Sequence, residues 1–351
     1  MGKRTDPLTQ LPIPLLEWYG EHARQLPWRS DPTAYHVWVS EIMLQQTRVA
    51  AVLDYYRRFM DAAPTVADLA RMPDEQLMKL WQGLGYYSRA RNLKRAAVQI
   101  VARFDGQFPD KYEDIRALPG VGDYTAGAIA SIAFGQAVPA VDGNVLRVVT
   151  RLTANPSDIT LPATKRQVAE KLGEIIPTAQ PGQFNQAMME LGATVCIPNG
   201  APLCDKCPAA QFCLARQKGL TAELPVKTPK KARRIEERTV FLIFRGNKVA
   251  LRQRGAKGLL AGLWEFPNEH APAEDALKKW GVEGIATPGD TGRHIFTHIE
   301  WHMSAIMVEA VDDRLPHGWV WASRQELDRQ YAVPNAFRAF ETAVRQQLGY
   351  F

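Results

Sequence analysis

The sequence predicts a multidomain fold, with an all-α region over residues 1–222 followed by an α+β region over residues 239–351. In the first region, apolar residues recur at three- and four-residue spacing, which is the period of a helix that buries one face. In the second region, runs such as TVFLIF are short, rich in β-branched and aromatic residues, and bounded by turn-forming residues. A chain of 351 residues is long enough for two or three such domains.

Helices are predicted in the first region where periodic segments lie between Pro or Gly residues. These segments are 34–60, 88–103, 124–134, 164–175 and 184–195. Residues 223–238 carry six basic residues and two prolines, so we expect a basic interdomain linker, either simply solvated or also resting on a polyanion. Beyond it, strands are predicted at 239–244, 247–254 and 299–311, with helices near 272–281 and 335–348.

The composition is that of a soluble protein with a mild basic excess. Hydrophobic residues make up 46% of the chain, and the formal net charge is +6, which favours a polyanionic partner. No apolar run approaches the roughly twenty residues of a membrane span, and the start MGKRTDPLTQ lacks the apolar core of a secretory signal. We therefore expect a cytoplasmic protein with no membrane association.

Two carboxylates stand out by their local sequence. Glu41 lies in VWVSEIMLQQT, where a carboxylate is costly unless it is paired or holds a proton; it is either a hydrogen-bonded core residue or an acid. Asp142 precedes Gly143 and Asn144 in PAVDGNVLRVV, and is either a helix N-cap or a carboxylate facing a cation. A protonated Glu paired with an ionised, solvated Asp is a recurring design for cleaving glycosidic bonds.

All four cysteines of the chain lie within one stretch of eighteen residues: Cys196, Cys204, Cys207 and Cys213. In a reducing compartment this clustering predicts one soft-metal site rather than disulfides. A structural zinc site usually has two CxxC pairs, and only CDKC is present here. An iron–sulfur cluster on four thiolates is favoured, and zinc remains the alternative.

Two glycine-bearing turns have features that suit DNA. In LPGVGDYTAGAIA, Gly120 and Gly122 allow backbone amides at a helix start to approach a phosphate, although tight helix–helix turns use the same glycines. In GLGYYSRARNLKRAA, Tyr86 and Tyr87 precede a run of basic residues. Such tyrosines either enter a base stack beside phosphate contacts or simply pack at the end of a solvated helix.

Together these motifs resemble the helix-hairpin-helix DNA glycosylases that carry an iron–sulfur cluster, and most closely the MutY group of adenine DNA glycosylases. The resemblance covers nearly the whole chain. It rests on SEIMLQQT, GLGYYSRARNL, LPGVGDYTAGAI, VDGNV, NQAMMELGATVC and GLWEFP, which occur in the family's order. It implies a helix-hairpin-helix catalytic domain with a cluster, a Nudix-like α+β domain, and monofunctional excision of adenine mispaired with 8-oxoguanine or guanine in base excision repair.

The resemblance also implies residue roles. Glu41 would protonate the Hoogsteen-edge nitrogen of the flipped adenine, Asp142 would stabilise the oxocarbenium carbon, and Tyr124 and Asn144 would support that chemistry. Contacts to DNA or the base are implied for Trp28, Arg29, Gln46, Thr47, Leu84, Tyr86, Gly120, Gly122, Glu190, Phe296, Thr297 and His298. The four cysteines would hold a [4Fe-4S] cluster, and the partner would be double-stranded DNA with an A:8-oxoguanine or A:G mispair, bound by a monomer in the bacterial cytosol.

The sequence departs from the family's pattern in three places. The first cysteine interval holds seven residues (IPNGAPL) where the family usually has six, and it lacks basic residues, which puts a DNA contact by this loop in doubt. The oxoguanine-reading loop has Thr297 where Ser is common, so the hydroxyl is kept. Where a Nudix hydrolase would carry metal-binding glutamates, EDALKKWGVE stands, so binding rather than pyrophosphate hydrolysis is expected.

Two rival functions remain alongside monofunctional excision. A bifunctional glycosylase/lyase like endonuclease III uses a lysine two residues after the hairpin's last glycine, and this position is Tyr124, with no lysine between Lys111 and Lys165. A damage-binding protein without catalysis is disfavoured by the presence of both Glu41 and Asp142.

Overall fold

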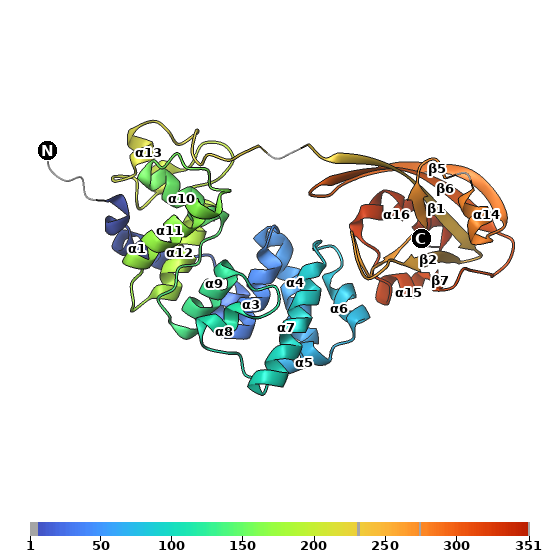
Figure 1. Cartoon of the computed structure of the whole chain (residues 1–351), viewed down its shortest axis with the longest axis horizontal. Helices are drawn as coiled ribbons and strands as arrows, with labels where there is room; N and C mark the ends of the chain where they lie inside the picture. The colour runs from blue at the N-terminus through green and yellow to red at the C-terminus, as the bar shows by residue number, and fades with distance from the viewer. Residues whose placement is uncertain (1–5, 230–231, 274, 350–351) are drawn as a thin grey trace. The chain divides into compact units, whose positions relative to one another are not determined.

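The computed structural model describes residues 6–229, 232–273 and 275–349, and it divides the chain into two compact units. The first unit combines Met1–Arg71 with Asn92–Pro229, and the second combines Met72–Arg91 with Lys230–Phe351. The first is helical and the second is built on a sheet (Figure 1), so the predicted fold class is confirmed. Residues 230 and 231 of the expected linker, and Glu274, lie outside the described residues.

The first unit is a set of helices joined by short turns. They are η1 (Pro7–Gln10), α1 (Pro12–His22), α2 (Pro27–Ser30), α3 (Ala34–Leu44), α4 (Val49–Ala62), α5 (Val66–Arg71), α7 (Ser88–Phe104), α8 (Tyr112–Arg116), α9 (Asp123–Phe134), α10 (Gly143–Thr153), α11 (Pro162–Ile175), α12 (Pro181–Thr194), η2 (Cys204–Lys206) and α13 (Leu214–Gln217). Helix α7 begins in the second unit and continues into the first. None of the helices in the described residues is long and apolar enough to cross a membrane.

Most of the predicted helices are present at the expected places. Helices α7, α9, α11 and α12 match the periodic segments to within three residues at each end. The prediction of one continuous helical segment over 34–60 is wrong, because the chain leaves the helix at Gln45 and Gln46 has a left-handed backbone (φ 59°). Residues 44–47, at this break, line the cavity described below.

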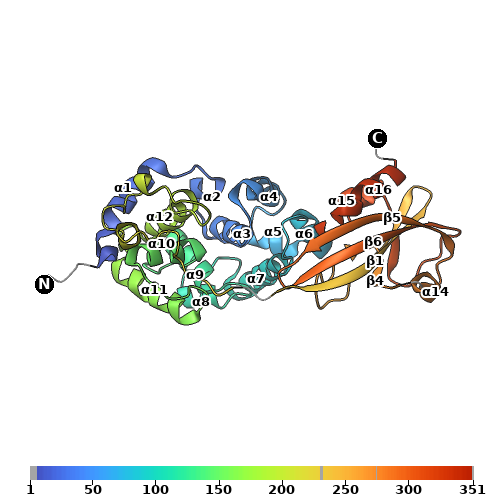
Figure 2. The ribbon, with the colours of Figure 1, turned by 90° about the horizontal axis from the view of Figure 1, so that it is seen from above.

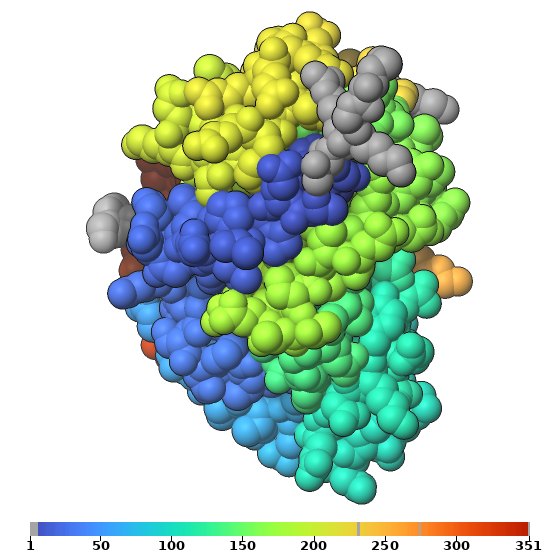
Figure 3. All heavy atoms as spheres, turned by 90° about the vertical axis from the view of Figure 1, so that its left-hand side faces the viewer, coloured from blue at the N-terminus to red at the C-terminus, as the bar shows by residue number. Residues whose placement is uncertain are grey.

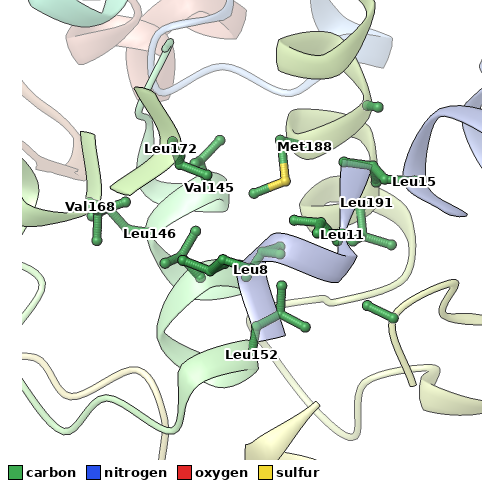
Figure 4. Packing of buried hydrophobic residues seen from close by; sticks show 14 of the residues in the cluster. Leu8, Leu11, Leu15, Val145, Leu146, Leu152, Val168, Leu172, Met188 and Leu191 are labelled. Atoms are coloured by element: carbon green, nitrogen blue, oxygen red, sulfur yellow. The ribbon is translucent and has the colours of Figure 1, made fainter. Parts of the chain in front are cut away.

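A buried apolar cluster holds the N-terminal segment against α10 and α12. Leu8, Leu11 and Leu15 pack with Leu146 and Leu191 among others (Figure 4). In the space-filling view, the blue N-terminal residues lie directly against the light-green and yellow parts of the chain (Figure 3). Burying such side chains contributes about 1.5–3 kcal/mol each, so this segment is part of the core that supports α10.

The second unit is a seven-stranded sheet with helices on its two faces. Its elements are α6 (Asp74–Trp81), β1 (Arg234–Arg245), β2 (Lys248–Gln253), β3 (Trp264–Glu265), β4 (Asn268–His270), α14 (Ala276–Trp280), β5 (Gly284–Ile295), β6 (Ile299–Ala310), β7 (Trp319–Ser323), α15 (Arg324–Arg329), η3 (Asn335–Phe340) and α16 (Glu341–Gln347). The strand order is β3-β2-β1-β6-β5, with β4 paired to β1 and β7 to β2. Figure 2 shows β1, β5 and β6 side by side.

Strand β1 is buried on both faces, because its side chains alternate between two cores. Val240, Leu242 and Phe244 face a cluster that includes residues of η3 and α16. Phe241 and Ile243 face the opposite cluster, which includes residues of α14. This double burial explains why TVFLIF is continuously apolar. The strand begins at Arg234, so the last five residues of the basic segment 223–238 belong to the sheet.

Candidate functional site

A single large cavity in the first unit gathers most of the predicted site residues. Its volume is about 1750 Å³, and it reaches from the end of α3 to the starts of α9 and α10. The predicted residues that line it are Trp28, Arg29, Glu41, Gln46, Thr47, Gly122, Tyr124, Asp142, Asn144 and Glu190. Gly120 is not among its lining residues, and the other predicted contacts, Leu84, Tyr86, Phe296, Thr297 and His298, belong to the second unit.

Glu41 is buried in α3, with only 6% of its surface exposed. Burial, which is the largest effect, and the negative charge of Asp142 raise the pKa of its carboxyl, whereas a hydrogen bond from Tyr124 and the charge of Arg29 lower it, and the resulting pKa is about 7. The Tyr124 hydroxyl donates to Glu41 Oε2. A carboxyl group in this state is partly protonated near neutral pH and can give its proton to a bound molecule.

Asp142 is the N-cap of α10 and opens toward the same cavity. Its Oδ1 accepts from the backbone N–H of Val145 at 2.8 Å, and its Oδ2 accepts from Asn144 Nδ2 at 2.8 Å. The side chain is half-buried rather than freely solvated as expected, and burial raises its pKa, although the hydrogen bonds from Val145 and Asn144 oppose the rise. The cap geometry is therefore present, and it leaves the carboxylate inside the cavity.

A third carboxylate, Glu190 on α12, is held by two arginines. It is 1% exposed. Arg24 donates through Nε to Oε1 at 2.5 Å and through Nη2 to Oε2 at 2.9 Å, while Arg29 donates to Oε2 at 2.8 Å. Burial alone would raise the pKa of Glu190, but the hydrogen bonds from the two arginines outweigh it and lower that pKa. Glu190 is thus an ionised, fixed acceptor at the wall of the cavity.

Sequence reasoning did not find Arg24. It lies in the loop between α1 and α2, and its partner Glu190 is 166 residues away, so no local spacing indicates the pair. Arg147 and Arg151 of α10 were missed as well, although their spacing of four residues within an apolar helix is an available signal. Both are buried.

The two buried arginines connect the start of α10 to the cysteine segment. Arg147 donates through Nη2 to Asn144 Oδ1 and to the carbonyl of Gly192, both at 2.8 Å, and through Nε to the carbonyl of Cys196 at 2.7 Å. Arg151 donates to the Cys196 Sγ at 3.3 Å. Asn144 is therefore held by Asp142 and by Arg147, and Arg147 also contacts the backbone at Cys196.

The four cysteines line one small pocket together with apolar residues of α10 and α12. All four are free thiols, and burial raises the pKa of Cys207 to about 12 and that of Cys213 above its usual value. Within the described residues, no group of three or more His, Cys, Asp or Glu side chains is arranged around a point that would hold a single metal ion. Four thiols line this pocket, and Arg151 donates to one of them. This donor set fits a cationic group larger than a single metal ion, whose charge would keep the thiols ionised.

The glycine-bearing hairpin lies between α8 and α9. Gly120 has φ +77°, and a Cβ there would meet Asn92 Cβ at 2.6 Å, so both the conformation and the close approach require glycine. Gly122 is the N-cap of α9. Asp123, the next residue, forms an exposed ion pair with Arg116 at this helix start.

In the second unit, the turn after α6 meets the loop between β5 and β6. Tyr86 is 46% exposed and has a left-handed backbone (φ 47°), whereas Leu84 is buried. The hydroxyls of Tyr86 and Thr297 lie 3.2 Å apart. Thr297 and His298 are exposed, and Phe296 packs edge-on against Trp301.

Two family models match the chain in sequence. The HhH-GPD superfamily of base excision DNA repair proteins matches residues 39–178, and the NUDIX domain matches residues 239–342. Among solved structures, the chain is similar to a thermostable thymine-DNA glycosylase (27% identity, TM-score 0.55, 60% of this chain and 97% of that one). It is also similar to endonuclease III trapped covalently on DNA (25% identity, TM-score 0.51, 61% and 98%).

Curated relatives match over both regions. The chain is 41% identical to the adenine DNA glycosylase of Homo sapiens, with 93% of this chain and 73% of that protein covered. It is 39% identical to the Rattus norvegicus enzyme (93% and 77%) and 35% identical to that of Buchnera aphidicola subsp. Schizaphis graminum (84% and 86%). The helical domain with its cavity, the Nudix-like sheet and these matches across both domains lead to one conclusion: the chain belongs to the family of adenine DNA glycosylases.

Proposed function

We propose that this protein removes adenine from A:8-oxoguanine and A:G mispairs in double-stranded DNA by hydrolysing the N-glycosidic bond, without cutting the strand. The observation that carries the proposal is the pairing of a buried Glu41, with a pKa of about 7, and a capping Asp142 in one cavity. A base inside a duplex cannot reach such a cavity, so the adenine nucleotide must be flipped out of the stack.

Glu41 acts as the general acid in this proposal. Its proton goes to a ring nitrogen of adenine, which turns the base into a neutral leaving group as the bond to the sugar breaks. The Tyr124 hydroxyl fixes the orientation of the Glu41 carboxyl by donating to Oε2. Because burial raises the pKa of Glu41 to about 7, a substantial fraction of the acid is protonated near neutral pH when a base arrives.

Asp142 stabilises the cation that forms on the sugar until water adds to that carbon and loses a proton, which leaves the sugar with a hydroxyl. Each carboxylate oxygen already accepts one hydrogen bond, from Val145 or from Asn144, so the side chain cannot swing away from the cavity. A fixed negative charge opposite a developing oxocarbenium ion lowers the barrier without reorganisation during the reaction. Asn144, itself held by Arg147, thus supports the reaction by orienting Asp142.

The adenine edge is recognised at the opposite wall in this proposal. Glu190, ionised and bound by Arg24 and Arg29, fixes the side chain of Arg29 at the cavity wall next to the base, and Trp28 contributes an apolar wall. Gln46 and Thr47 follow the end of α3 and line the cavity, and in this proposal they fill the emptied position in the duplex.

The remaining predicted contacts are assigned to the duplex. The hairpin amides near Gly120 and Gly122 bind a phosphate, Leu84 and Tyr86 disturb the stack at 8-oxoguanine, and the loop of Phe296, Thr297 and His298 reads that base. Exposure of Tyr86, Thr297 and His298 in one unit supports this assignment. The domain division at residues 222 and 238 is part of the same proposal, as are a monomer and a cytoplasmic location.

The four cysteines are proposed to hold a [4Fe-4S] cluster. Cys196, Cys204, Cys207 and Cys213 would hold the cluster, whose positive charge would keep these buried thiols ionised. The anaerobically purified protein is expected to be yellow-brown and to contain about four irons per chain, measured by metal analysis and visible absorbance. One zinc per chain with no visible band would contradict the cluster and favour zinc.

Excision on a duplex with one A:8-oxoguanine pair tests the reaction. We expect strand breakage at the adenine position only after alkali, because Tyr124 stands where a lyase needs lysine. Breakage before alkali would indicate the bifunctional alternative, and binding without adenine release would indicate a non-catalytic damage binder.

A further inference from the structure

Helix α6 is fastened to the loop that follows α15. Lys79 Nζ donates to the carbonyl of Leu327 at 2.6 Å and to that of Tyr331 at 3.2 Å. Three residues further along, Gln82 Nε2 donates to the carbonyl of Val333 at 2.7 Å. The lysine stands near the C-terminal end of α15, where free carbonyls and the helix dipole favour a cation. We name residues 327–334, from the end of α15 through the loop that follows it, the docking loop.

Two further hydrogen bonds join residues 83–91 to other parts of the second unit. Asn335 Nδ2 donates to the carbonyl of Gly83 at 3.4 Å, and Arg91 donates to the carbonyl of Ala261 at 2.8 Å. In each of these contacts the acceptor is a backbone carbonyl. The attachment therefore depends on the path of the chain in the Nudix-like domain and on the donor side chains.

The turn held by these contacts has an unfavourable backbone. Gly83, Gly85 and Tyr86 all have positive φ, and Tyr86, at φ 47°, has a side chain that makes this conformation costly. Arg89 lies beneath the turn and donates to the carbonyls of Leu84 and Gly85 at 3.0 and 3.1 Å. Arg89 bonds carbonyls within the turn, whereas Gln82 and Asn335 hold its start at Gln82 and Gly83, and Lys79 holds the helix that precedes it.

We propose that Lys79 and Gln82 are positioning residues through which the docking loop keeps Tyr86 in its left-handed, exposed conformation before DNA arrives. This rests on the proposed function in one respect, the entry of Tyr86 into the duplex. A side chain that is already ordered loses less conformational freedom on binding, so the preset turn favours insertion. The Nudix-like domain then holds the backbone of the turn through these contacts, in addition to the contact of Thr297 with the Tyr86 hydroxyl.

Hydrogen exchange in the full-length protein without DNA tests the positioning directly. The variants are Lys79→Met and Gln82→Met, which keep the aliphatic stems and remove the donors, with Lys79→Arg as the conservative variant and Lys278→Met, on exposed α14, as the matched control. In Lys79→Met and Gln82→Met, backbone amides in 83–87 should exchange about tenfold faster, because a hydrogen bond to a charged or amide donor is worth that factor or more. Lys79→Arg should restore protection, and Lys278→Met should change nothing. Unchanged exchange in either Met variant that folds overturns the inference.

Excision kinetics then separates positioning from base reading. Single-turnover rates at saturating protein should fall by a similar factor on A:8-oxoguanine and A:G duplexes in Lys79→Met and in Gln82→Met, so that the ratio of the two rates is kept. If only the ratio changes, the docking loop acts in base reading and the proposed positioning role is wrong. If the wild-type protein releases no adenine, the proposed function fails, while the exchange result still decides the role of Lys79 and Gln82. Each single variant is checked by its unfolding temperature, and either folded variant is sufficient to decide the outcome.

Discussion

Glu41 and Asp142 share a cavity but are held by different kinds of contact. Glu41 is enclosed by apolar residues and receives one hydrogen bond, from a phenol, so burial dominates its pKa. Asp142 receives a backbone N–H and an amide, contacts that favour its charged form and oppose the effect of burial. Burial thus raises the pKa of both carboxyls, but the two hydrogen bonds to Asp142 oppose the rise there, whereas Glu41 holds its proton up to about pH 7.

Replacement of Glu41 by Gln tests the acid role. The amide keeps the shape but cannot supply a proton, so adenine release should fall by at least two powers of ten, while affinity for an A:8-oxoguanine duplex stays within about threefold. Single-turnover excision and a gel-shift titration measure the two quantities. Release within tenfold of the wild-type rate would remove Glu41 from the chemistry.

The pH dependence of excision follows from the same carboxyl. The acid is active when protonated, and its pKa is about 7, so the single-turnover rate should be level below pH 7 and fall about tenfold per unit above it.

The stability of the fold should also depend on pH through Glu41. The folded state holds a proton that the unfolded state releases near the ordinary pKa of a glutamate. This contribution to stability is therefore lost as pH rises toward and through 7. Glu41→Gln should therefore lose less stability than the wild type between pH 5 and pH 8, as measured by thermal unfolding; equal losses would contradict the raised pKa.

At the scale of elements, local sequence predicts what is buried better than what is exposed. The buried helices and β1 follow from apolar spacing, and the α10 N-cap follows from Asp142-Gly143-Asn144. Strand β5 was not predicted, because GIATPGDTGRHI is largely exposed at the sheet edge and its pairing with β6 supplies the order. Pairing with a distant strand leaves no signal in the local sequence. The ion pair between Arg24 and Glu190, which are 166 residues apart, was missed for the same reason.

The contact of α12 with α10 at Gly192 offers a test at this scale. A Cβ on Gly192 would lie 2.5 Å from Asn144 Cβ, so Gly192→Ala must displace Asn144 and with it the hydrogen bond to Asp142. We expect a loss of stability of about 1–3 kcal/mol, typical of overpacking, and a slower excision rate. Gly20→Ala on α1 is the control, because a Cβ there meets nothing within 4 Å. If both variants behave alike, the packing of Asn144 does not govern Asp142.

At the scale of the whole molecule, the order of the sequence motifs predicts the family. It does not predict which residues make up each compact unit. The sequence predicts a helical region ending near residue 222 and an α+β domain from 239, a division that stays a prediction. The two compact units cross that division, because Met72–Arg91 clusters with the C-terminal residues. Contacts such as Lys79 with Leu327 and Tyr331 create this arrangement, and neither partner's local sequence indicates them.

Removal of all residues after 222 tests the division of labour. The truncated protein keeps Glu41, Asp142 and the cavity, so it should still release adenine. It should lose most of its preference for 8-oxoguanine over guanine, because Thr297 and His298 are gone; base-edge contacts of this kind supply about 1–3 kcal/mol of discrimination.

The double variant Thr297→Ala with His298→Ala in the full-length chain should lower the ratio of the excision rates on A:8-oxoguanine and A:G. Its overall rate should fall less than that of the truncated protein, because the docking loop remains. Rates on A:8-oxoguanine and A:G duplexes are compared at one salt concentration. A ratio unchanged in both proteins would assign the reading of oxoguanine to Gln46 and Tyr86.

The discontinuous second unit has a consequence for biosynthesis. Residues 72–91 leave the ribosome long before the docking loop is translated, and at about 5–20 residues per second the interval is on the order of ten seconds or more. During that time Lys79, Gln82 and the left-handed turn have none of their carbonyl acceptors in the Nudix-like domain. The nascent helical region can complete its own core first, so the turn around Tyr86 is among the last parts of the chain to reach its final conformation.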